Sequence, residues 1–87
     1  MALDWDKLRI FHAAAEAGSF THAADALNLS QSAISRQVAA LENEIGVPLF
    51  HRHARGLVLS EQGELLFQTA NDVLKRLETV RMQLTET

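Results

Sequence analysis

The sequence contains no cysteine among its 87 residues, and this absence narrows the chemistry open to it. Without thiols there is no disulfide framework, no cysteine nucleophile and no thiolate metal site, which is compatible with a reducing cytoplasm. No apolar run approaches the roughly 20 residues that cross a membrane. The start, Met-Ala-Leu-Asp-Trp-Asp, lacks the basic and apolar regions of a signal peptide. We therefore expect one small cytoplasmic domain with no membrane contact.

Positive charge is also scarce, because eight Lys and Arg against eleven Asp and Glu give a formal net charge of −3. Taken alone, this balance argues against a nucleic-acid-binding protein, which usually has a basic surface. The charges are unevenly distributed, however. Residues 1–29 hold four acids and two bases, residues 61–87 hold five acids and three bases, and residues 30–60 hold two acids and three bases. The middle of the chain is therefore the least acidic part and could present a local positive face.

Motifs for catalysis and for metal binding are missing as well. The sequence has no Gly-x-Ser-x-Gly and no phosphate-binding loop. His12 has no second ligand at helical spacing, and the pair His51 and His53 has no third ligand within sequence reach. We therefore expect no enzymatic activity, no catalytic residue, no metal and no cofactor.

What the sequence does contain is a pair of helical patterns joined by a very short break. Each pattern places apolar residues on one helical face. These residues are Phe20, Ala23, Ala24 and Leu27, then Ile34, Val38, Leu41 and Ile45. In the break, Asn28 can take the left-handed conformation that ends a helix, Leu29 can fill the angle between the helices, and Ser30 is a good N-cap. Two short helices joined in this way are typical of a helix-turn-helix.

Boundary signals predict the other elements. A first helix begins after Asp4 and ends before Gly18, and Ser19 caps the helix that follows. Residues 49–59, LFHRHARGLVL, predict a small hairpin that turns at Gly56. Ser60 caps a last helix that runs nearly to the end of the chain. We expect the first helix to pack on the last through one face, which carries Trp5, Leu8, Phe11 and Ala15.

The last helix carries a heptad seam, which long helices use to pair. We call its members the seam residues: Leu66, Ala70, Val73, Leu77, Val80 and Leu84. One interpretation is a helix whose apolar faces are all covered within one chain. We favour a homodimer, because a domain of this size is marginally stable by itself.

The composition at the start of the third helix indicates base reading. The side chains on the face away from the core are Gln31, Ser32, Ser35 and Arg36. Gln can pair with adenine, Arg with guanine or a phosphate, and Ser lets the backbone come close. Two further sites have two interpretations each. Thr21 could bind a phosphate, and the hairpin arginines Arg52 and Arg55 could bind the DNA backbone or the minor groove. Alternatively, these side chains are ordinary solvent-exposed polar residues.

Nearly the whole chain resembles the N-terminal DNA-binding domain of LysR-type transcriptional regulators of bacteria. The matching stretches are LRIFHAAAEAGSFTHAADALNLSQSAISRQVAALENEIGVPLFHR and RGLVLSEQGELL. The resemblance implies a mainly α fold, a winged helix-turn-helix of three helices and a β-hairpin wing over residues 1–59, followed by a linker helix for dimerisation over 60–87. It implies that the third helix enters the major groove of promoter DNA, with Thr21 on a phosphate and Arg55 near the minor groove.

The resemblance also implies partners beyond DNA. Family members act as homodimers, often tetramerise when full length, and have RNA polymerase as a further partner. They carry a C-terminal domain that binds a small-molecule effector. This chain stops where that domain would begin, so we favour a fragment of a regulator over a natural short protein. We expect it in the bacterial cytoplasm, on the nucleoid.

Two functions of different classes remain after this reasoning. The first is sequence-specific double-stranded DNA binding by a dimer on a partly palindromic operator. The alternative is a helical protein-interaction module without DNA binding, which the overall charge favours and the Gln-Ser-Arg face opposes. The operator, the target genes, the effector and the choice between activation and repression cannot be deduced from these residues.

Overall fold

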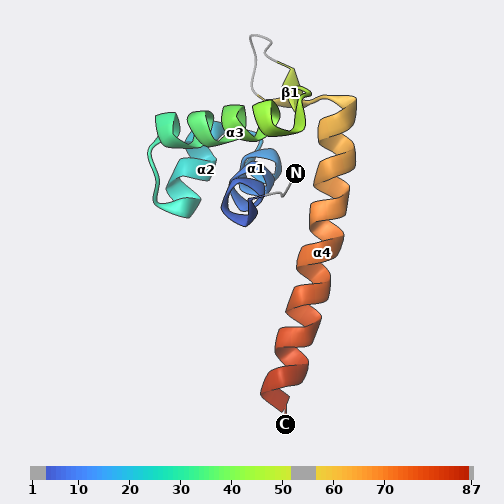
Figure 1. Ribbon diagram of the computed structural model, residues 1–87. Coiled ribbons are helices and arrows are strands. Elements are labelled where there is room, and N and C mark those ends of the chain that lie inside the picture. The colour runs from blue at the N-terminus through green and yellow to red at the C-terminus, as the bar shows by residue number, and fades with distance from the viewer. Residues whose placement is uncertain (1–3, 52–56, 87) are drawn as a thin grey trace.

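The computed structural model describes residues 4–51 and 57–86, which form four helices and a two-stranded sheet. In chain order the elements are α1 (Trp5–Ala17), α2 (Phe20–Leu27), α3 (Gln31–Ile45), β1 (Phe50–His51), β2 (Val58–Leu59) and α4 (Glu61–Glu86). Helices α1, α2 and α3 form a head, and α4 passes the head and projects away from it as a stalk (Figure 1). The predicted fold class, a mainly α winged helix-turn-helix with a long final helix, is confirmed.

Side chains and backbone conformations next to each helix explain where α1, α2 and α3 begin and end. The Asp4 carboxylate accepts hydrogen bonds from the backbone N–H groups of Asp6 and Lys7, so it caps α1 as predicted. Ser19 caps α2 and Ser30 caps α3 in the same way. Each of the three helices ends in the left-handed conformation, with φ angles of 70°, 56° and 91° at Gly18, Asn28 and Gly46.

Ser60 ties the start of α4 to the segment that follows α3. Its hydroxyl accepts a hydrogen bond from the N–H of Gly63 at 3.0 Å and donates one to the carbonyl oxygen of Pro48 at 2.7 Å. Gly63 is buried, and a Cβ atom at this position would lie 2.0 Å from the carbonyl oxygen of Leu49. Glycine therefore allows α4 to approach the chain this closely.

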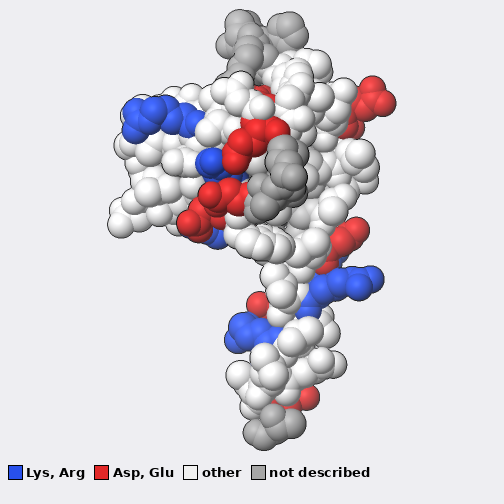
Figure 2. Space-filling view, viewed as in Figure 1, with Lys and Arg blue, Asp and Glu red and all other residues white. Residues whose placement is uncertain are grey.

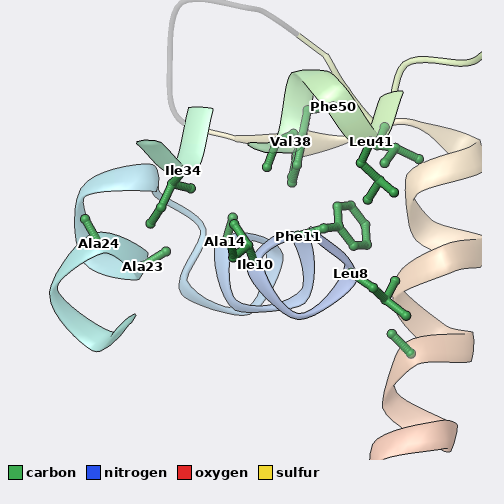
Figure 3. Packing of buried hydrophobic residues seen from close by; sticks show 12 residues of the cluster. Leu8, Ile10, Phe11, Ala14, Ala23, Ala24, Ile34, Val38, Leu41 and Phe50 are labelled. Carbon is green, nitrogen blue, oxygen red and sulfur yellow. The ribbon is translucent and has the colours of Figure 1, made fainter. Parts of the chain in front are cut away.

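The hydrophobic core lies where the helices of the head meet. Phe11 of α1 and Ile34, Val38 and Leu41 of α3 are each 0% exposed, and their side chains point into the space between the helices (Figure 3). Phe50 of β1 extends this core, with its ring centroid 5.4 Å from that of Phe11. The inward stripe predicted for α3 is thus confirmed, and the opposite face of α3 lies on the surface.

Two apolar residues lie differently from the sequence prediction. Leu29 is predicted to fill the angle between α2 and α3, but it is 40% exposed. The buried side chains of Ala23 and Ala24 lie beside Ile34 instead, so small residues fill this crossing (Figure 3). Trp5 is predicted to pack on α4, but it is 65% exposed and borders a hollow beside α4.

The predicted hairpin is confirmed in its two strands. β1 pairs antiparallel with β2, with Phe50 opposite Leu59 and His51 opposite Val58. The turn between them, with Arg52, Arg55 and Gly56, lies outside the described residues. No helix within residues 4–51 and 57–86 is both long and apolar enough to cross a membrane.

Candidate nucleic-acid interface

The outer face of α3 begins at the helix-turn-helix break and carries small and polar side chains. Gln31, Ser32 and Arg36 are exposed, while Ser35 is half-buried. Because α3 turns about 100° per residue, Ser32 and Arg36 lie on one line opposite the buried stripe, and Ala39 continues that line. The structure therefore brings the four predicted reading residues to one exposed end of α3, with Ser35 at its margin.

Arg36 supplies the positive charge of this face. No carboxylate among the described residues forms a salt bridge with it, whereas Lys7, Arg9 and Arg81 each pair with an acid. A basic group lies at the end of the head where α3 begins, and no acidic side chain of the described residues is seen beside it, whereas acidic side chains gather nearer the middle of the head (Figure 2). The guanidinium group is thus available to a phosphate or a base.

The two acidic residues of α3, Glu42 and Glu44, lie near its C-terminal end and both have partners within the protein. The Glu42 carboxylate accepts hydrogen bonds from the N–H groups of Leu49 at 2.7 Å and Phe50 at 3.3 Å. The Glu44 carboxylate lies 2.7 Å from Nζ of Lys7, and this hydrogen bond raises the pKa of Lys7 above its ordinary value. Neither acid lies on the line of Ser32 and Arg36, so the outer face keeps its positive charge.

The role of Glu42 could not be found by sequence reasoning. Its carboxylate binds the backbone at the start of β1, so one side chain of α3 positions the first strand of the hairpin. The only sequence signal is an acidic residue in the last turns of a helix, where its charge interacts unfavourably with the helix dipole. Such a position suggests that the carboxylate has a partner elsewhere.

The first turns of α2 and α3 meet at the break. The Ser19 hydroxyl accepts hydrogen bonds from the N–H groups of Thr21 and His22. The Thr21 hydroxyl in turn donates a hydrogen bond to the amide oxygen Oε1 of Gln31 at 3.3 Å. Thr21 therefore lies beside the exposed start of α3, and its backbone N–H and its hydroxyl both have partners within the protein. Its predicted phosphate contact stays a prediction.

The hairpin arginines predicted to contact DNA, Arg52 and Arg55, lie outside the described residues, so their role stays a prediction. Of the two histidines considered as a metal-ligand pair, His51 is exposed on β1 and His53 lies outside the described residues. Within residues 4–51 and 57–86, no group of three or more His, Cys, Asp or Glu side chains could hold a metal ion.

The seam residues divide between the head and the surface. Ala70 is 3% exposed, and Leu66 and Val73 are half-buried near the head. Leu77, Val80 and Leu84 are 56%, 48% and 70% exposed, on the part of α4 that projects beyond the head (Figure 1). A second subunit would therefore contact mainly the later half of the predicted seam.

An apolar hollow of about 150 Å³ lies between α1 and α4, next to the exposed seam. Its wall includes Trp5 and Leu8 from α1 and Val73, Leu74 and Leu77 from α4. At the same junction, Nε2 of His12 lies 2.6 Å from Oδ1 of Asn71, and the His12 ring stacks on Phe67 with the ring centroids 5.2 Å apart. His12 therefore links α1 to α4.

Comparison with known proteins assigns this arrangement to a family. Residues 5–64, which include α1 to α3, the hairpin and the start of α4, match the family described as "Bacterial regulatory helix-turn-helix protein, lysR family". This chain belongs to the LysR family. The resemblance stated from the sequence is thereby confirmed.

Curated relatives of this LysR-family chain are transcriptional regulators. The HTH-type transcriptional activator AmpR of Yersinia enterocolitica is 49% identical over 72 residues, which make up 83% of this chain and 24% of AmpR. The HTH-type transcriptional regulator BudR of Klebsiella aerogenes is 46% identical over 67 residues, which make up 77% of this chain and 47% of BudR. The LysR-family chain thus spans about a quarter to a half of the length of these relatives.

Solved structures of the LysR family share this fold. The BenM DNA-binding domain in complex with benA site 1 DNA has a TM-score of 0.88 and 32% sequence identity, over 97% of this chain and 94% of that chain. Full-length LysG from Corynebacterium glutamicum has a TM-score of 0.88 and 30% identity, over 98% of this chain and 29% of LysG. The LysR-family chain therefore has the fold of a domain that has been crystallised on DNA.

Proposed function

We propose that this chain binds double-stranded DNA sequence-specifically, as the DNA-binding part of a bacterial transcriptional regulator. The observation that carries the proposal is the exposed end of α3, where Arg36 has no acidic partner among the described residues, on a fold that matches the BenM domain bound to DNA. An α-helix fits the major groove, where base edges differ between the four base pairs. The reading helix is α3.

Each residue on this face has a distinct role in the proposal. Arg36 binds a phosphate or a guanine, since its guanidinium group can donate two parallel hydrogen bonds. Gln31 binds a base edge, with adenine as its best match. Ser32 and Ser35 have short side chains, so they let the helix backbone approach the DNA and can donate to phosphate oxygens.

The wing extends the contact beyond the major groove. β1 and β2 pair with His51 opposite Val58. Arg52 and Arg55 of the segment between them would contact the DNA backbone, and Arg55 would reach the neighbouring minor groove, where a narrow groove attracts arginine. These two contacts are supported by the family resemblance.

The acidic balance of the chain makes a dimer part of the proposal. With a net charge of −3, nonspecific attraction to DNA is weak, and one head offers few phosphate contacts. Two heads joined through exposed residues of α4 would bind two half-sites on successive turns of the groove. The linked second head binds at high effective concentration, which raises the affinity for a partly palindromic operator.

The remaining partners follow from the same family. The proposal includes, from the family resemblance, a regulator with a second domain for a small-molecule effector. Such a regulator would act on promoter DNA in the bacterial cytoplasm, on the nucleoid, and RNA polymerase would be its partner during transcription.

A titration of labelled duplexes tests the proposal. The chain is added to the DNA next to its own gene and to a scrambled duplex of equal length, while fluorescence anisotropy is recorded at several salt concentrations. We expect tighter binding to the natural duplex and a steep loss of affinity as salt rises, because bound phosphates release counterions. Equal affinity for both duplexes would exclude sequence-specific binding and favour a protein-interaction module.

A further inference from the structure

Thr21 and Gln31 meet across the helix-turn-helix break, although they belong to different helices. Thr21 lies in the first turn of α2 and Gln31 is the first residue of α3. The Thr21 hydroxyl donates a hydrogen bond to Oε1 of Gln31 at 3.3 Å, and both residues are exposed. A side chain of α2 thereby orients the amide group at the start of the proposed reading helix.

This hydrogen bond competes with the phosphate contact predicted for Thr21. A threonine hydroxyl has a single proton to donate. While it donates to Gln31, it cannot donate to a phosphate. The backbone N–H of Thr21 is also occupied, because the Ser19 hydroxyl accepts it at 3.1 Å. The donors that a phosphate would need are therefore engaged at Thr21.

The orientation of the Gln31 amide decides which base it matches. Adenine offers one donor and one acceptor in the major groove, so the amide oxygen and the amide NH₂ group must face it in a fixed order. Guanine offers two acceptors, which an amide turned to present its NH₂ group can satisfy. An amide oxygen has two lone pairs. One can accept from Thr21 while the other stays available to adenine.

We propose that Thr21 is a positioning residue that gives Gln31 its preference for adenine over guanine. The inference rests on the proposed function, since it assigns a role within the same DNA interface. Thr21 acts through Gln31 and touches no base itself. A hydrogen bond of 3.3 Å is long for two oxygen atoms, so it biases the amide and does not lock it.

Selection from a random duplex library tests the inference. Bound sequences are recovered with the unmodified chain, Thr21→Val, Thr21→Ser and Gln31→Ala, and base preferences are compared position by position. Thr79→Val is the matched control, because Thr79 is exposed on α4 and its hydroxyl donates only to the Lys75 carbonyl in its own helix.

We expect the unmodified chain to select adenine at one position of each half-site, and Gln31→Ala to erase that preference. Thr21→Val should reduce the preference for adenine over guanine about fivefold at that position alone, the range that one neutral hydrogen bond supplies. Thr21→Ser, which keeps the hydroxyl, should restore it. In a Gln31→Ala background, Thr21→Val should have no further effect on base preference.

Other outcomes overturn the inference. A uniform loss of affinity in Thr21→Val, with base preferences unchanged, would show a phosphate contact or a purely structural role. Selection of guanine at the position controlled by Gln31 would also contradict it. If the unmodified chain selects no sequence at all, the proposed function fails and the inference fails with it. Thermal unfolding of each variant checks that the fold is intact.

Discussion

Arg36 is the residue on which the proposed DNA binding should depend most. It is exposed at the proposed reading end of α3, and no acid among the described residues pairs with it. We expect Arg36→Ala to weaken binding to a specific duplex at least about tenfold, because hydrogen bonds to charged groups contribute about 1.5–3 kcal/mol each. Fluorescence anisotropy measures the loss, and sedimentation checks that oligomerisation is unchanged.

A matched variant controls for the removal of one positive charge. Arg76→Ala also deletes an exposed arginine, but from the projecting helix α4. It should bind DNA nearly as tightly as the unmodified chain. If Arg36→Ala and Arg76→Ala behave alike, α3 is not the reading helix.

Gly63 is the residue at which one added methyl group should cost most stability. A Cβ atom there would lie 2.0 Å from the Leu49 carbonyl oxygen and 2.9 Å from the carbonyl carbon, and backbone atoms cannot move aside without shifting α4. We expect Gly63→Ala to lower the free energy of unfolding by about 3 kcal/mol, the upper range for overpacking. For a chain of this size the melting temperature should fall by about 15 °C.

The neighbouring exposed residue gives the control for this prediction. Gln62→Ala changes the same turn of α4 without a new contact and should alter stability by less than about 0.5 kcal/mol. Circular dichroism during heating measures both variants. A melting temperature of Gly63→Ala within a few degrees of the parent would mean that α4 does not approach Leu49 this closely.

At the scale of elements, Glu42 couples α3 to β1. Its carboxylate is an acceptor for two backbone N–H groups, those of Leu49 and Phe50, which are 1% and 2% exposed. We expect Glu42→Ala to destabilise the chain by about 2 kcal/mol, because buried donors would lose their partner. Urea unfolding provides the measurement.

The other acid of α3 serves as the control for Glu42. Glu44→Ala removes an ion pair with Lys7 near the surface, where water screens the charges, so its effect should be smaller. Glu42→Gln should lose less than Glu42→Ala, since its amide oxygen can still accept a hydrogen bond. Equal stability of all three variants would contradict a positioning role for Glu42.

At the scale of the whole molecule, α4 leaves apolar surface that the head does not cover. Leu77, Val80 and Leu84 are all about half exposed or more, on the projecting part of the helix. We expect Leu77→Glu to convert a dimer into a monomer, because a charge in an apolar interface loses its hydration. Analytical ultracentrifugation measures the change. Binding to a duplex with two half-sites should weaken sharply, while binding to one half-site should change little.

Thr79→Glu is the control for this prediction. It adds the same charge two residues along the helix, about 200° around from Leu77 and away from the exposed seam. Thr79→Glu should remain dimeric. A Leu77→Glu variant that sediments like the parent would rule out the later half of the seam as the interface.

Prediction from sequence succeeded where a structure depends on neighbouring residues. The caps at Asp4, Ser19, Ser30 and Ser60 each bond to an N–H group only a few positions along the chain. The stripe of Ile34, Val38 and Leu41 follows from helical spacing alone. The exposure of Ser32 and Arg36 opposite this stripe follows from the same spacing, while their contact with DNA stays a prediction.

Prediction failed where the answer depends on which element lies nearby. Leu29 and Trp5 are apolar, yet both are exposed, because Ala23 and Ala24 already fill the crossing and α4 passes beside the head without covering Trp5. The partners of His12, Glu42 and Thr21 lie 59, 7 and 10 residues away. No local sequence pattern predicts these hydrogen-bond partners.

The sequence by itself therefore determined the helices, their caps, the core stripe and the family, since these depend on spacing and on short-range hydrogen bonds. The tertiary structure alone decided how these parts act on one another. In it, Ala70 is buried against the head and Leu77 is exposed. The Glu42 carboxylate accepts a hydrogen bond at the start of the hairpin, and the Thr21 hydroxyl donates one to Gln31. The physical reason is that burial and side-chain partners depend on distances between helices, which arise only when the whole head has packed.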